Sequence, residues 1–249
     1  MSEEKYKFPT ETIDLPSGGK LYSKDSPLSS GKLDVKYMTA KEEDILTSQN
    51  LIKKGIVIDK LLDSLIVTEG VKTEDLILGD KNAVMVAARI LAYGPDYECE
   101  IVNPDDNKTV NYTFDLSSCP FKNTPEDVSE NNFSAELPAS KANITFKLLT
   151  GKEEKMIEEE ISSLKKTGSQ ILPELTTRLR YTVTSVDGDS TQGVINNFVA
   201  NMLSRDSLFL RKKITEVSPD IQLEQEVEIG GETVTVNIPM TVNFFWPKT

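Results

Sequence analysis

The acidic side chains of this sequence come nearest, in type and spacing, to a catalytic pattern. Lys-Glu-Glu occurs at 41–43 and again at 152–154, and three consecutive glutamates follow at 158–160. Paired carboxylates can serve general acid–base catalysis or bind a metal ion. Acidic residues in a first helical turn, however, also face the positive end of the helix dipole. The pattern favours helix capping and a solvated surface over chemistry.

The residues that most enzymes and metal sites need are scarce. The chain contains no histidine and only two cysteines, Cys99 and Cys119. A structural zinc site needs four cysteine or histidine ligands, and histidine is the usual activator of a serine or cysteine nucleophile. In a protein made in a cytoplasm, free thiols are favoured over the alternative of one disulfide. We expect no enzyme activity, no catalytic residue, no metal and no cofactor.

A glycine-lysine run and a basic cluster are the next candidates for ligand contact. The run at 18–20, Gly-Gly-Lys, lacks the preceding strand, the second spaced glycine and the following Ser or Thr of a phosphate-binding loop, so a turn is favoured. The basic cluster lies in an expected helix. It forms either a solvated, ion-paired face of that helix or a contact for an acidic partner. It comprises Arg205, Arg211, Lys212 and Lys213.

Aromatic residues gather close to the C-terminus and include the only tryptophan. Phe244, Phe245 and Trp246 either dock a last strand into the core or form a partner-binding patch. The second interpretation matters because aromatic anchors dominate the energetics of protein interfaces. The candidate partner-binding residues are therefore Phe244, Phe245, Trp246, Arg211 and Lys212.

Composition limits the class of protein further. The 249 residues are 38% hydrophobic and 27% charged, which is typical of a globular protein of one or two domains. The formal charge of −12 argues against nucleic-acid binding, which needs clustered Lys and Arg. The N-terminus lacks the apolar core of a signal peptide, and no apolar run is long enough to span a bilayer. We expect a soluble protein without membrane contact, made in a cytoplasm.

Two copies of one sequence pattern mark the elements that must position these residues. VKYMTAKEEDIL occupies 35–46, and FKLLTGKEEKMI occupies 146–157. In each copy a strand-like run leads into Thr-x-x-Glu, the capping box in which the threonine and the glutamate each accept a backbone N–H of the other. The pattern predicts a strand-to-helix junction at Thr39 and at Thr150.

A similar order of elements follows each junction. The first copy predicts a helix from Thr39 to about residue 50, a second helix over 58–65 and a third that starts from an N-cap at Asp80. A hairpin with strands at 97–102 and 109–116 follows. The second copy predicts four helices, which start at Thr150, start at Pro173, span 195–202 and start from an N-cap at Asp206. A hairpin with strands at 221–229 and 233–245 follows.

The spacing of these marks predicts an internal duplication. The two threonines are 111 residues apart and the two aspartates 126, so the second copy holds 15 more residues, enough for its additional helix. Grouped strands and helices favour an α+β fold made of a duplicated unit of strand, helices and β-hairpin. The predicted divisions are an arm at 1–34, a first unit at 35–119, a linker at 120–143 and a second unit at 144–249.

Five stretches of the sequence together carry a family resemblance: LPSGGKLY, SPLSSGKLDVKYMTAKEEDIL, NLIKKGIVIDKLL, GDKNAVMVAARILAYGPDYE and IPMTVNFFWP. They resemble the baseplate hub subunit and hub-assembly family of T-even-like contractile-tailed bacteriophages. The resemblance covers nearly the whole chain and is densest over 15–97 and 205–247. Members of that family can carry Cys-x-x-Cys turns in their two hairpins, where this chain reads NPDDNK and IGGE. A zinc-ribbon site is therefore expected to be lost.

The resemblance implies a structural or assembly component of a phage tail baseplate hub that acts by protein–protein contacts. The alternative is a transient chaperone that holds a tail protein before its incorporation. Either role implies other tail or baseplate proteins as partners. The protein is then expected in the host cytoplasm during assembly and, if structural, in the tail baseplate of the virion.

Overall fold

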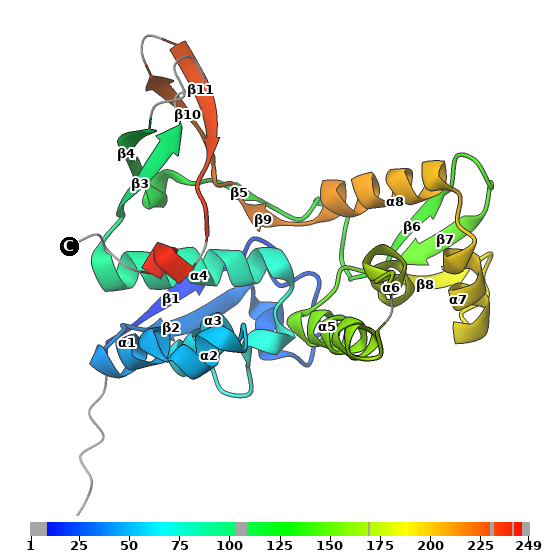
Figure 1. Cartoon of the computed structure of the whole chain (residues 1–249), viewed down its shortest axis with the longest axis horizontal. Helices are drawn as coiled ribbons and strands as arrows, with labels where there is room; N and C mark the ends of the chain where they lie inside the picture. Colours follow the sequence, from blue (N-terminus) through cyan, green and yellow to red (C-terminus); the bar gives the residue numbers. More distant parts are fainter. Residues whose placement is uncertain (1–8, 103–108, 169, 230–231, 241, 246–249) are drawn as a thin grey trace, which may run out of the picture.

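The protein folds into two lobes, each with its own hydrophobic core (Figure 1). The computed structural model describes residues 9–102, 109–168, 170–229, 232–240 and 242–245. The first lobe has a core built from residues between 15 and 119 together with residues between 221 and 245. The second lobe has a core built mainly from residues between 133 and 217. The secondary structure confirms the predicted α+β class.

The first lobe begins with a two-stranded antiparallel sheet and a group of short helices. Strand β1 (Thr10–Asp14) pairs with β2 (Lys32–Lys36), and the 3-10 helix η1 (Pro27–Ser30) lies between them in the chain. The helix predicted from Thr39 to about residue 50 is split in two at Ser48. The elements that follow are α1 (Ala40–Thr47), α2 (Gln49–Lys53), α3 (Val57–Leu65) and the 3-10 helix η2 (Thr73–Asp75).

Helix α4 (Leu78–Tyr93) runs through the middle of the first lobe and leads into the predicted hairpin. Strand β3 (Asp96–Val102) pairs with β4 (Thr109–Asp115), while the predicted turn at 103–107 lies outside the described residues. The 3-10 helix η3 (Leu116–Ser118) and strand β5 (Phe121–Lys122) follow. Cys99 and Cys119 are both buried as thiols rather than joined in a disulfide, as expected.

The second lobe combines one three-stranded sheet with four helices. The strands lie in the order β6 (Phe133–Glu136), β7 (Asn143–Phe146), β8 (Val183–Val186), and both pairings are antiparallel. The helices are α5 (Gly151–Lys166), α6 (Glu174–Thr182), which starts directly after Pro173, α7 (Gln192–Ala200) and α8 (Ser204–Val217). The predicted linker at 120–143 thus contains β5 and β6.

The C-terminal part of the chain returns to the first lobe. Strand β9 (Asp220–Ile221) pairs with β5, and β10 (Glu224–Ile229) forms a hairpin with β11 (Glu232–Asn237). Figure 1 shows the two hairpins together on the same side of α4. The predicted strand at 233–245 ends early, because residues 242–245 form the 3-10 helix η4 (Val242–Phe245). The predicted second unit therefore contributes to both cores.

Close backbone contacts join the two lobes. An isolated antiparallel bridge links Ile77 to Thr150. A Cβ atom placed on Gly79 would lie 1.8 Å from the carbonyl oxygen of Pro219, and one on Gly151 would lie 3.0 Å from the Cα of Glu74. Only glycine allows the first of these approaches, since real Cβ atoms do not come that close to backbone atoms. No helix in the described part of the chain is long and apolar enough to cross a bilayer.

The two predicted strand-to-helix junctions have matching contacts. The Thr39 N–H donates to Glu42 Oε2 at 3.0 Å, and the Thr150 N–H donates to Glu153 Oε2 at 2.7 Å. Each glutamate also accepts a hydrogen bond from a lysine of the preceding segment, Lys36 in the first lobe and Lys147 in the second. The glutamate half of the capping box is therefore formed at both junctions.

The predicted N-caps at Asp80 and Asp206 are wrong in a similar way. Helices α4 and α8 begin after Ile77 and Leu203, which places each aspartate at the third helical position. Both carboxylates bind a remote segment instead of their own helix end. Asp80 accepts from Ser17, at 2.9 Å from N–H and 2.6 Å from the hydroxyl. Asp206 accepts at 2.7 Å and 2.9 Å from the backbone N–H groups of residues 139 and 140. The duplication itself stays a prediction.

Candidate partner-binding groove

The structure places Phe244 and Phe245 inside the first core. Both are 0% exposed, and their rings meet edge to face with centroids 5.5 Å apart. The Phe244 ring also lies 5.0 Å from the ring of Tyr97. A partner would reach these two side chains only after η4 had left the core. Trp246 lies outside the described residues, and the aromatic partner patch stays a prediction.

The predicted basic residues lie on α8, where Arg205, Arg211 and Lys212 are exposed and Lys213 is half-buried. Lys213 forms an ion pair with Glu216 at 2.8 Å. The side chains of Arg211 and Lys212, in contrast, make no hydrogen bond or ion pair with another residue of the described structure. Arg211 is therefore available to a ligand, and its surroundings decide what that ligand can be.

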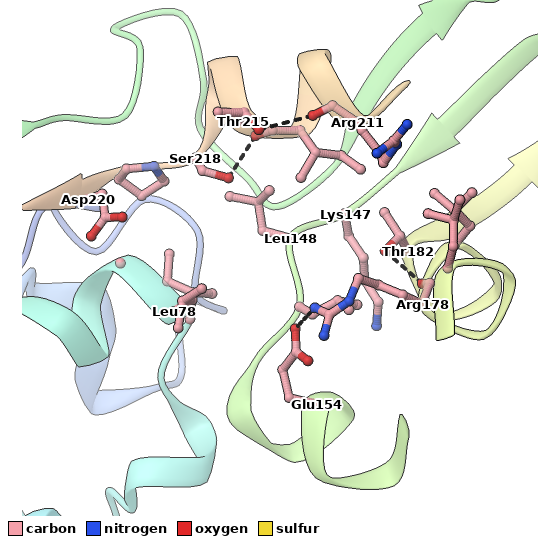
Figure 2. A pocket seen from close by; sticks show the side chains of 17 residues that line it. Leu78, Lys147, Leu148, Glu154, Arg178, Thr182, Arg211, Thr215, Ser218 and Asp220 are labelled. Carbon is pink, nitrogen blue, oxygen red and sulfur yellow. Dashed lines mark hydrogen bonds and ion pairs between the residues drawn. The ribbon is translucent and has the colours of Figure 1, made fainter. Parts of the chain in front are cut away.

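Arg211 lies on the wall of a hollow between the lobes, which we call the inter-lobe groove. It holds about 400 Å³ and is half open to solvent. Figure 2 shows α8 with Arg211 and Thr215 on one side, and Glu154 and Arg178 on the other. The lining comprises Ile77, Leu78, Gly79, Lys147, Leu148, Leu149, Glu154, Leu175, Arg178, Leu179, Thr182, Arg211, Ile214, Thr215, Ser218, Pro219 and Asp220.

A second hollow of about 210 Å³, the α8 hollow, shares part of this lining. Leu175, Leu179 and Arg211 line both, so the two hollows adjoin along α8. The other lining residues are Thr176, Val199, Ala200, Met202, Ser204 and Ser207. Ser207 is 7% exposed, and its hydroxyl is the only buried side-chain polar atom in the described structure without a hydrogen-bond partner.

The charges on the inter-lobe groove leave one cation unpaired. Of the three lining cations, Lys147 pairs with Glu153 and Arg178 pairs with Glu154. Only Arg211 has no carboxylate partner among the described residues. The lining acid Asp220 accepts a hydrogen bond from an asparagine of α4 at 3.0 Å. Because Lys147 and Arg178 are neutralised by glutamates and the asparagine is neutral, the uncompensated charges on the lining are one cation, Arg211, and one anion, Asp220.

The capping-box glutamates do not have the properties of acid–base catalysts. Burial alone would raise the pKa of Glu42, but hydrogen bonds from Lys36, Thr39 and Ser64 outweigh it and lower the pKa to about 2. Hydrogen bonds from the matching lysine and threonine likewise lower the pKa of Glu153 against its burial. A carboxylate held ionised in this way is a poor proton carrier near neutral pH. No group of three or more metal-ligating side chains occurs among the described residues.

The groove combines apolar side chains with the unpaired Arg211, which suits binding. Leu78 is 60% exposed and Leu175 is 43% exposed, both on the groove lining. The sequence marked Arg211 by its charge and predicted a helix from Pro173, the helix that carries Leu175 and Leu179. Leu78 and Ser207 were missed, because nothing local marks a residue that meets the groove only after the lobes have packed together.

Comparison with known proteins identifies one family. No curated protein and no solved structure gives a significant match to the chain. A family model described as T4 bacteriophage base plate protein matches residues 8–246, which is nearly the whole length. The chain therefore belongs to the T4 bacteriophage base plate protein family.

Proposed function

We propose that this baseplate protein is a structural or assembly component of the tail baseplate hub and that it acts by protein–protein contacts. The family supports a place in the baseplate. The inter-lobe groove is the observation that carries the proposal, because it exposes Leu78 and Leu175 beside the unpaired Arg211. Exposed apolar surface bordered by polar groups is typical of interaction sites.

The partners are other tail or baseplate proteins rather than nucleic acid or membrane. A net charge of −12 opposes binding to a phosphate backbone. The groove offers no residues arranged for a reaction, so we infer a non-enzymatic role, in keeping with the family. Assembly then takes place in the host cytoplasm, and a structural subunit stays in the virion tail.

Deletion of the gene, combined with mass spectrometry of purified virions, tests this proposal. A hub component is expected to be required for tail formation and to be found in intact tails. Normal infectious tails from the deletion mutant would overturn the proposal.

A transient tail-assembly chaperone is the second candidate. It is favoured by the continuous apolar wall that Leu175 and Leu179 give to both hollows, since such a wall can hold an apolar segment temporarily. A chaperone is expected to be required for tails, to be absent from virions, and to co-purify with a tail protein from infected cells. Presence at constant stoichiometry in mature tails would exclude it.

A further inference from the structure

We propose that the open face of α8 is a receptor for one acidic side chain carried by an apolar segment of the partner protein. In this arrangement Ser207 and Arg211 hold the carboxylate, and the walls of the two hollows hold the neighbouring apolar residues. The inference rests on the proposed function and names the chemistry of the partner. It goes beyond the groove itself by assigning a polar recognition pair.

The positions on α8 form a single track. Residues that line the hollows recur along the helix at spacings of three and four, and these spacings place side chains on one helix face. They are Ser204, Ser207, Arg211, Ile214, Thr215 and Ser218. Ser207 and Arg211 are four residues apart and line the same hollow, so one ligand group can meet both.

Arg211 provides the charge that selects an acid. The other lining cations are already paired with glutamates, so a carboxylate entering the groove finds its complement at Arg211. A guanidinium presents two parallel N–H donors that match the two oxygens of a carboxylate. Because this side chain has no partner within the ranges that the structure describes, binding an acid breaks no ion pair found there.

Ser207 supplies independent evidence for a missing ligand group. Buried polar groups in folded proteins are almost always hydrogen-bonded, and an orphaned one lowers stability. The Ser207 hydroxyl has no hydrogen-bond partner among the described residues, although Ser207 is 93% buried on the wall of the α8 hollow. An acceptor oxygen from a bound segment would satisfy it, and a carboxylate bound to Arg211 brings that oxygen to the same face.

The matching helix of the first lobe indicates that a polypeptide segment, rather than a small molecule, fits this face. There, η4 of the same chain packs against α4, and the main-chain oxygen of Phe244 accepts a hydrogen bond from Arg89 at 3.1 Å. No described segment of this chain occupies the groove beside α8. A second copy of the chain is disfavoured, because two molecules of net charge −12 repel.

Peptide selection against the full chain tests the inference. The probe is a random library of 14-residue peptides, the length of α8, panned on the immobilised protein. Enriched peptides are expected to carry Asp or Glu flanked by apolar residues. Fluorescence anisotropy with one such peptide should show affinity reduced about tenfold or more by Arg211→Glu, and much less by Arg211→Lys, which keeps the charge. Replacement of the acid in the peptide by its amide should give a similar loss.

Two further variants separate recognition from a general electrostatic or structural effect. Lys212→Glu removes the adjacent exposed cation, which lines neither hollow, and should leave peptide affinity unchanged. Ser207→Ala should weaken peptide binding several-fold while the melting temperature of the free chain stays the same or rises. Enrichment of peptides without acids, equal losses from Arg211→Glu and Lys212→Glu, a destabilising Ser207→Ala, or concentration-dependent dimers that Arg211→Glu abolishes would each overturn the inference.

The same variants in phage distinguish a failed inference from a failed function. If deletion of the gene prevents tail formation but Arg211→Glu phage assemble normally, the carboxylate receptor is wrong and the baseplate role stands. If deletion has no effect on tails, the baseplate role is wrong. The peptide measurements then still decide whether α8 binds acids.

Discussion

Helices α4 and α8 occupy matching places in the two lobes but have different surroundings. Each carries an aspartate at its third position, Asp80 or Asp206, which binds the segment that follows the first strand of its lobe. Eight residues of α4 are buried, against three of α8. The matching local contacts therefore do not lead to matching burial, and the less buried helix provides the candidate site.

The difference comes from where the second hairpin packs. Val227, Ile238 and the two phenylalanines of η4 all join the first core, so the first lobe receives both hairpins of the chain. Counted from the two aspartates, the position of Arg89 corresponds to Thr215. Arg89 is 4% exposed under η4, whereas Thr215 is exposed on the groove lining. A partner segment at α8 would supply the cover that the chain itself gives to α4.

Phe244→Ala should have the largest effect on this asymmetry. Truncation of a fully buried phenylalanine removes transfer energy and leaves a cavity, at a cost of about 3–5 kcal/mol in unfolding free energy. Hydrogen exchange should accelerate in α4 and the hairpins but not in α5, α6 or α7. Leu175→Ala on the groove is the control and should change stability by less than about 0.5 kcal/mol. Equal acceleration in both lobes would contradict two separate cores.

Gly79→Ala should be the next most disruptive change, because it acts on the contact between the lobes. Its methyl group would lie 1.8 Å from a backbone oxygen, so the chain around Pro219 must move, at a cost of roughly 3 kcal/mol. Gly193→Ala in α7 is the matched control, since no atom lies within 4 Å of its added Cβ. Urea denaturation should show the control neutral or stabilised by about 0.4–1 kcal/mol. Similar losses from both would exclude the clash as the cause.

Arg89→Met should loosen η4 without emptying the core. It removes three hydrogen bonds to the main-chain oxygens of Phe244, Gly94 and Asp96, which lie 3.1 Å, 3.1 Å and 3.3 Å from the donor nitrogens. Loss of buried hydrogen bonds predicts a cost of about 1–3 kcal/mol, measured by chemical denaturation. The corresponding Thr215→Ala should stay within about 0.5 kcal/mol. An equal cost at both positions would remove the contrast between the helices.

The two aspartates should give the smallest effect but opposite pH dependences. Burial raises the pKa of Asp80, against the hydrogen bonds from Ser17 and Tyr22. Burial would also raise the pKa of Asp206, but the hydrogen bonds from residues 139 and 140 outweigh it, so that pKa is lowered. A carboxyl group whose pKa is lowered by folding stabilises the folded state at pH values above its pKa in the unfolded chain, and this contribution is lost as the pH falls through the folded-state pKa. A carboxyl group whose pKa is raised by folding stabilises the folded state at pH values below its pKa in the unfolded chain, and this contribution is lost as the pH rises through the folded-state pKa.

Denaturation of Asp206→Asn and Asp80→Asn between about pH 7 and about pH 3 measures this contrast. The stability difference from the unmodified chain should shrink on acidification for Asp206→Asn and grow for Asp80→Asn. Parallel pH profiles for the two variants would show that the two carboxylates are in equivalent environments.

The parts of the fold that could be predicted are those specified by neighbours in sequence. Thr39 and Thr150 lie three residues from the glutamates that bind them, and the hairpin strands alternate polar and apolar residues over most of their length. The strand β6 was missed because its four residues stand among polar and proline-rich neighbours and gain their hydrogen bonds from β7. The local sequence pattern does not predict a strand whose hydrogen bonds come from another strand outside that stretch.

The site was predictable only in its charge. Arg211 stood out in the sequence as part of a basic cluster on an acidic chain. The aspartates were misplaced as N-caps because their true donors are at least 58 residues away in the sequence. For the same reason, no sequence signal assigned the last hairpin to the first lobe or left α8 uncovered. These features depend on long-range packing, which residue spacing does not encode.

The return of the C-terminus to the first core sets an order for folding during synthesis. All residues of the second core precede residue 218, so this core can be completed as soon as residue 217 has left the ribosome. The first lobe, although synthesised earlier, must wait for Phe244 and Phe245. At 5–20 residues per second, the 126 residues between Cys119 and Phe245 take roughly 6 to 25 s. Throughout that interval the part of the first core that Phe244 and Phe245 complete lacks its cover.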